Sequence, residues 1–228
     1  MPDASVRSLD VYRAPFSRIF SPAAAFSPAL SWRAALWPLA LATTVELWLA
    51  YLTQPFVLQA VRAVAPPTMS EVLEMQLAAS LRFFMLGAVT RPAAFCIVVT
   101  LVLFGLLVAS GHVARLGRLL AVVATANLVL ALKHAYVFGI LQARGIGSIS
   151  GPGDLEARVG LGAFLPVDDP VLLVVVESIN LFDIWFLVLI TIAIQRTEQA
   201  STRAAGVIVL VAGLLACTYR IVLAALTL

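Results

Sequence analysis

Five long apolar runs constrain this chain more than any other feature. They cover about residues 34–52, 92–110, 119–141, 170–195 and 205–228, and polar or proline-containing segments separate them. A helix needs about 20 mainly apolar residues to cross the ~30 Å hydrocarbon core of a bilayer. Each run meets this requirement. The sequence therefore predicts an all-α, polytopic membrane helix bundle with five transmembrane helices.

Composition supports the same class of protein. Of the 228 residues, 62% are hydrophobic and 12% are charged, whereas a soluble domain has about 45–50% and about 25%. The net charge of +3 is small and the arginines are scattered, which excludes a nucleic-acid partner. Cys96 and Cys217 lie far apart inside apolar runs, so they form no metal-ligand or redox spacing. We expect no cofactor and no metal.

Arginine placement predicts the orientation of the bundle, because basic loops stay on the cytosolic side. The short loops "GHVARLGR" and "RTEQASTR" are both basic and closely flanked by apolar runs. They place the N-terminus in the cytosol and, after five spans, the C-terminus outside. We expect residues 1–33 to be a cytosolic segment with a short interfacial helix, and residues 34–228 to be the transmembrane domain. Lys133 is the only lysine and alanine is abundant, which is typical of a high-GC bacterium and predicts the inner membrane.

The segment of residues 68–90 has an amphipathic pattern. Thr68 and Glu71 have the spacing of a capping box. Apolar residues then recur at helical spacing, at Leu73, Leu77, Leu81 and Phe84. Three structures fit this pattern: a helix lying on the outer membrane interface, a helical extension of the second span that is broken near Pro92, or an ordinary packed loop helix.

A second segment outside the spans, "ARGIGSISGPGDLEARVGLG", is rich in glycine and serine. This composition is typical of a flexible loop. Its glycines lack the strand and helix context of a nucleotide-binding loop.

Polar and ionisable residues inside the predicted spans are the candidate functional residues, because such groups are costly in a membrane. They are Glu46, Asn127, Lys133, His134, Glu177, Asn180, Asp183 and Arg220. At helical spacing in the fourth span, Glu177, Asn180 and Asp183 form one polar stripe, with Asp183 near the middle of the membrane. The acids and bases nearly balance. We therefore expect a buried polar network, in which an acid of the fourth span pairs with Lys133 or Arg220.

The chain has no sequence motif of a known catalytic site, so no catalytic residue is predicted. Two interpretations of the polar residues remain. They form a structural network between helices, or Glu177 and Asp183 line a proton path, since proton relays use such groups.

One stretch resembles the most characteristic part of the Yip family, named for Ypt/Rab-GTPase-interacting proteins. It reads "LPVDDPVLLVVVESINLFDIWFLVLITIAIQRTEQASTRAA", and its signature is Ser178 to Trp185. "IFSPAAAF", Ile19 to Phe26, and "RLLAVVATANLVLALK" are also similar to family segments. The resemblance implies five membrane helices and a cytosolic N-terminus, with Phe182 and Trp185 as packing residues of the signature.

The family resemblance also implies a function. Eukaryotic relatives associate with Rab GTPases and with one another in vesicle traffic. The Asp-Leu-Tyr-Gly-Pro motif of those relatives is absent here, and a Rab-type GTPase is expected as a partner only if the chain is eukaryotic. We therefore expect a non-enzymatic membrane protein with membrane-organising or trafficking-like roles, which contacts lipids and forms a homo- or hetero-oligomer. The alternative is a small transporter or proton-coupled channel subunit.

Overall fold

The computed structural model describes most of the apolar part of the chain, namely residues 26, 30–64, 70–155, 159–164, 170–177 and 179–226. The described residues contain helices and turns and no strand. The α-helices are α3 (Leu36–Val64), α4 (Ser70–Ala109), α5 (Leu116–Arg144), α6 (Pro170–Glu177), α7 (Leu181–Thr197) and α8 (Thr202–Leu226). Short 3-10 helices are η1 (Trp32–Ala35), η3 (Ile146–Ser148), η4 (Pro152–Leu155) and η5 (Gly160–Ala163).

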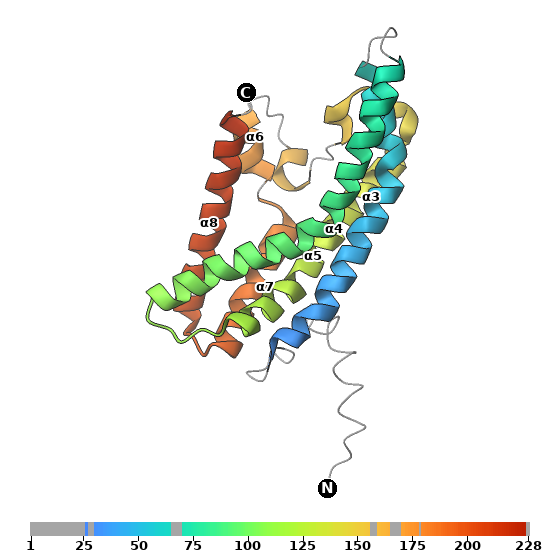
Figure 1. Ribbon diagram of the computed structural model, residues 1–228. Coiled ribbons are helices and arrows are strands. Elements are labelled where there is room, and N and C mark those ends of the chain that lie inside the picture. Colours follow the sequence, from blue (N-terminus) through green and yellow to red (C-terminus); the bar gives the residue numbers. More distant parts are fainter. Residues whose placement is uncertain are drawn as a thin grey trace.

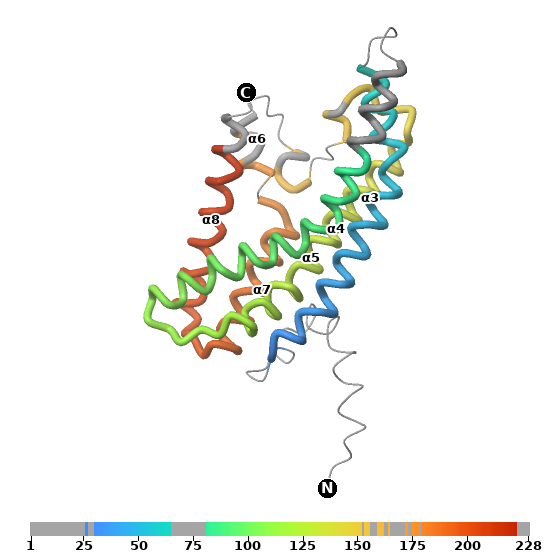
Figure 2. Tube along the Cα trace, in the orientation of Figure 1, coloured from blue at the N-terminus to red at the C-terminus, as the bar shows by residue number. Residues whose placement is uncertain are grey.

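The long helices run alternately up and down the bundle. In Figure 2 the trace rises along α3, descends along α4, rises along α5, descends along α7 and rises again along α8. Helix α5 is central, because it packs against α3, α4, α7 and η1 (Figure 1). Its first half supplies much of the main apolar core, including Leu119, Val122 and Val129.

Four helical stretches are long and apolar enough to cross a membrane. They are Trp32–Val64, Leu81–Ala109, Leu116–Arg144 and Thr202–Val222. They correspond to four of the five apolar runs, so an all-helical bundle with membrane-length helices is confirmed.

The remaining run does not form the single helix that its hydropathy predicts. Helix α6 ends at Glu177 and α7 begins at Leu181. Between them Asn180 has an extended backbone (φ −130°, ψ 160°), and its side chain accepts a hydrogen bond from the Asp183 N–H. Asparagine favours this N-cap position over a helix interior, because its amide satisfies a backbone donor there. The prediction of an unbroken helix over 170–195 is therefore wrong, and so is the single polar stripe.

Helix α4 makes residues 70–90 a helical extension of the second span, one of the three structures considered, but the helix is not broken near Pro92. It runs without interruption from Ser70 to Ala109 and contains Pro92. It changes direction about half-way along its length (Figure 1), as expected where proline removes a backbone hydrogen bond. The predicted cap at Thr68 lies outside the described residues.

The glycine- and serine-rich segment is more regular than its composition predicts. It contains η3, η4 and η5. The Asp154 carboxylate accepts hydrogen bonds from the Ser150 N–H and hydroxyl, at 2.7 Å and 2.6 Å. Ile149 packs with Phe56 and Leu141 in a second, smaller apolar cluster. This cluster joins the loop to α3 and α5.

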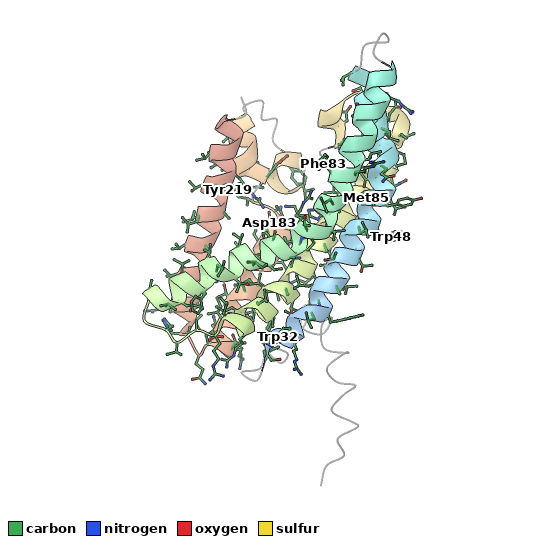
Figure 3. The ribbon with its side chains drawn as sticks, viewed as in Figure 1. Trp32, Trp48, Phe83, Met85, Asp183 and Tyr219 are labelled. Atoms are coloured by element: carbon green, nitrogen blue, oxygen red, sulfur yellow. The ribbon has the colours of Figure 1, made fainter. Side chains whose placement is uncertain are left out.

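Exposed tryptophans and tyrosines fall into two bands along the bundle. Trp32 and Trp37 lie at the start of the helical region, and the others lie farther along their helices, namely Trp48, Tyr51, Tyr136 and Tyr219. Figure 3 shows Trp32 at one end of the bundle, Trp48 about half-way along it and Tyr219 toward the other end. At about 1.5 Å per residue, Trp48 lies about 24 Å beyond Trp32. Two aromatic bands at about this spacing are typical of the two faces of a membrane.

Most of the N-terminal segment, including the predicted interfacial helix and the family-like residues Phe20 and Pro22, lies outside the described residues. Phe26 is described, and its side chain is buried in the main core.

Candidate functional site

An ion pair between α5 and α7 is the centre of the candidate site. The Lys133 Nζ lies 3.0 Å from the Asp183 Oδ2, and the two side chains are only 20% and 18% exposed. A third charged group, the Arg220 guanidinium of α8, lies 4.0 Å from the same oxygen and is half exposed. The pairing that charge balance predicts is therefore present, and Asp183 interacts with both candidate bases. We call Asp183, Lys133, Arg220 and Asn180 the Asp183 cluster.

Asn180 connects the helix break to this cluster. Its Oδ1 accepts a hydrogen bond from the Asp183 N–H at 2.9 Å. Its Nδ2 donates to the Asp183 carboxylate and, at 2.9 Å, to the Glu177 carbonyl. One buried amide therefore supports both ends of the break and orients the carboxylate toward Lys133.

The loop η5 closes over the break. The Leu161 N–H donates a hydrogen bond to the Ile179 carbonyl at 3.3 Å. Gly160 has φ +86°, and a Cβ there would lie 2.6 Å from both the Asn180 Cβ and the Ile179 carbonyl oxygen. Only glycine fits this conformation and this space. The Gly160 backbone thus holds the break in place.

A second polar pair lies next to the first. His134 Nδ1 of α5 contacts Glu46 Oε1 of α3, with the imidazole 41% and the carboxylate 11% exposed. Neighbouring helical residues point about 100° apart. Lys133 therefore reaches α7 while His134 reaches α3, and the central helix is joined to two neighbours at one level.

Not every predicted network residue joins these pairs. Asn127 is buried in α5 among apolar residues, and it makes no hydrogen bond with either pair in the described part of the chain. Glu177 contributes its backbone carbonyl at the break. The signature aromatics Phe182 and Trp185 pack against the main core, and the Phe182 ring lies 5.7 Å from that of Tyr136.

The site lies at the level of several exposed aromatic side chains. Glu46 precedes Trp48 by half a turn, His134 likewise precedes Tyr136, and Arg220 follows Tyr219. Figure 3 shows Asp183 in the same part of the bundle as Trp48 and Tyr219, away from Trp32. The expected position of Asp183 near the middle of the membrane stays a prediction.

A further buried pair at the opposite end was not predicted. Arg118 Nη1 of α5 lies 3.7 Å from Glu198 Oε1, at the end of α7, and the Glu198 side chain is fully buried. Arg118 also donates to the Thr197 carbonyl. In the sequence Glu198 belongs to a short basic loop, where a carboxylate is ordinarily solvated. Hydropathy gives no signal for its burial.

This pair predicts a pH dependence of stability. Burial raises the pKa of the Glu198 carboxyl, and the nearby Arg118 guanidinium opposes part of that shift. The folded protein then holds this proton more tightly than an unfolded chain with a pKa of 4.5. We expect the contribution of Glu198 to the free energy of unfolding to fall as pH rises above that value. Glu198→Gln should flatten this dependence in melting experiments across the acidic range, and equal slopes in both proteins would contradict the prediction.

These features define a class of protein: an all-helical bundle with membrane-length helices whose internal charges are paired between helices. Among the residues that the structure describes, no three potential metal ligands gather in one place. Comparisons with protein-family models, curated proteins and solved structures give no match to this chain. The site must therefore be interpreted from its own geometry.

Proposed function

We propose that this chain is a non-enzymatic integral membrane protein of Yip type, which acts in membrane organisation through contacts with lipids or other membrane proteins. The observation that carries this proposal is the pairing of the internal charges. Asp183 is bound by Lys133 at 3.0 Å and by the Asn180 amide. A carboxylate held by three helices and a cap is suited to fixing helices together.

The outer surface of the bundle supports the same proposal. Helix α8 exposes a row of large apolar side chains, including Val207, Leu210 and Leu214. The second half of α4 does the same with Ile97, Val98 and Leu101. Such surfaces fit lipid chains or the helices of a partner. A homo- or hetero-oligomer would use part of them.

The topology we propose has five spans, with α6 and α7 together as the broken fourth. Helix α7 alone is about 26 Å long, close to the thickness of the hydrocarbon core. The end of the bundle with Arg115 and Arg196 would face the cytosol by the positive-inside rule. The N-terminus would then be cytosolic, the C-terminus outside, and the bacterial inner membrane the location.

Membership of the Yip family is part of the proposal and rests on the resemblance of Ser178 to Trp185. Within this stretch Asn180 caps α7 and Phe182 packs against Tyr136, which supports a structural role for both. A signature that forms a cap, an ion pair and an aromatic contact has a structural role in this fold.

Transport is the second candidate function, and the helix break favours it. Broken helices with polar groups at the break form the substrate sites of many transporters. Here the break adjoins Asp183, and the residue after its partner Lys133 is His134, which contacts Glu46. A proton-coupled mechanism would use Asp183 and Glu177.

Reconstitution in liposomes with an internal pH-sensitive dye distinguishes the two functions. For a scaffold, vesicles with the wild-type protein and with Asp183→Asn should show the proton flux of protein-free vesicles, and Asp183→Asn should lower the melting temperature or change the oligomeric state. Flux that the wild type supports and Asp183→Asn abolishes, with an intact fold, would replace the scaffold by a transporter. Mass spectrometry of proteins and lipids that co-purify with the native protein would then identify the partner.

A further inference from the structure

Four exposed arginines gather at the end of the bundle opposite the Asp183 cluster. They are Arg33 in η1, Arg115 before α5, Arg196 at the end of α7 and Arg203 at the start of α8. Figure 1 shows that η1, the α4–α5 turn and the α7–α8 turn all lie at this end. We call these four residues the basic end.

No exposed carboxylate balances these charges in the described residues of this end. Glu198 is the one acid within 30–38, 108–120 and 193–206. The Glu198 side chain is fully buried, and its Oε1 lies 3.7 Å from the Arg118 Nη1. The exposed charged side chains of these described residues are therefore all basic, although the whole chain carries a net charge of only +3.

Specific contacts hold these arginines together in spite of their mutual repulsion. Gly117 lies at the start of α5, where a Cβ would be 3.1 Å from the Trp32 Cβ, so η1 packs closely on that turn. The Arg33 guanidinium lies 5.9 Å from the centre of the Trp32 ring. Arg118 ties the end of α7, next to Arg196, to α5. Like charges held by the fold produce a strong local field, which attracts anions.

Exposed tryptophans at the same end of the bundle indicate which kind of anion these arginines would meet. Trp32 and Trp37 are both half exposed, and tryptophans prefer the headgroup region of a bilayer. Arg33, whose guanidinium lies against the Trp32 ring, would then lie at the depth of the lipid phosphates. A guanidinium presents paired N–H donors that match two phosphate oxygens. An acidic protein would have to approach the same surface through the headgroups.

We propose that the basic end is a binding surface for anionic phospholipids, with Arg33, Arg115, Arg196 and Arg203 holding the headgroup phosphates. This inference goes beyond the proposed function and does not depend on it, because a scaffold and a transporter could both carry such a surface. Each arginine near an anionic membrane surface is worth about fivefold in affinity. Loss of all four should therefore remove most of the preference for anionic lipid.

The test uses the purified full-length protein in neutral detergent and measures binding of single lipids by native mass spectrometry and thermal shift. The probes are dioctanoyl phosphatidylglycerol, dioctanoyl phosphatidylcholine and the free glycerophosphoglycerol headgroup. We expect the wild type to bind phosphatidylglycerol at least about tenfold more tightly than phosphatidylcholine. The variant R33Q/R115Q/R196Q/R203Q should lose this preference.

A matched control separates the site from net charge. The variant R62Q/R82Q/R91Q/R144Q also removes four exposed arginines, all away from the basic end, and it should keep the preference. Equal loss in both variants, or retention in the basic-end variant, would overturn the proposal. If the free glycerophosphoglycerol headgroup bound as tightly as dioctanoyl phosphatidylglycerol, the arginines would form an ion site and not a lipid-binding surface, and the proposal would be wrong.

A second measurement keeps the proposal testable if the basic-end variant does not fold. In the wild type the preference for phosphatidylglycerol should fall steeply as NaCl is raised, because added ions screen exposed charges. A preference that does not change with salt would overturn the proposal. A preference for an acidic protein over phosphatidylglycerol, measured in competition, would assign the basic end to a protein partner instead.

Discussion

Replacing Asp183 by leucine is expected to lower the free energy of unfolding by about 3 kcal/mol, because it leaves a buried lysine without its partner. Lys133 is 20% exposed and lies 3.0 Å from the carboxylate it would lose. The Asn180 amide would lose an acceptor in the same change. Thermal or denaturant unfolding in detergent would measure the effect.

The control for this substitution is the double variant K133M/D183L. Removing both partners of a buried pair costs much less than removing one, since no unpaired charge remains between α5 and α7. We expect the double variant to be more stable than Asp183→Leu alone. The single variant Lys133→Met completes the double-mutant cycle from which the coupling energy of the two residues is obtained. Additive losses would mean that the two residues contribute independently, and the structural role of the pair would then be wrong.

The second large effect is expected at Gly160. A methyl group added there would meet the Asn180 Cβ and the Ile179 carbonyl oxygen at 2.6 Å, with the backbone at φ +86°. Overpacking costs about 1–3 kcal/mol and the left-handed conformation adds about 1–2 kcal/mol. We expect Gly160→Ala to lower the free energy of unfolding by about 2–5 kcal/mol and to open the helix break.

Two other glycines of the same loop separate strain from crowding. Gly145 has φ +79° but nothing within 4 Å of an added Cβ, and Gly147 has neither constraint. The loss of stability should therefore follow the order Gly160→Ala, Gly145→Ala, Gly147→Ala, with the last close to zero. If Gly160→Ala and Gly145→Ala had the same effect, the contact between η5 and the break would contribute nothing.

The two predictions concern the same part of the protein. Gly160 supports the break at Asn180, Asn180 orients Asp183, and Asp183 pairs with Lys133. Each group satisfies the next in surroundings that contain few other partners. The loop outside the helices and the charges inside them therefore form one unit.

Prediction from sequence was most accurate where the signal is local. Apolar runs of membrane length identified four of the long helices, because the hydrocarbon requirement is a property of each segment alone. It was least accurate at residues 170–195, where mean hydropathy is high on both sides of Asn180 but one side-chain cap ends the helix. Averaging over a window does not register a single hydrogen bond.

The amino-acid sequence by itself determined that this chain forms a helical bundle of membrane length, and that its acids and bases must find partners, because unpaired charges in a bilayer are costly. Tertiary structure decided which groups meet. It paired Asp183 with Lys133 and Glu46 with His134, and it buried Glu198 against Arg118. The physical reason is that an ion pair depends on the relative placement of two helices, which follows from the packing of the whole bundle and not from any one segment.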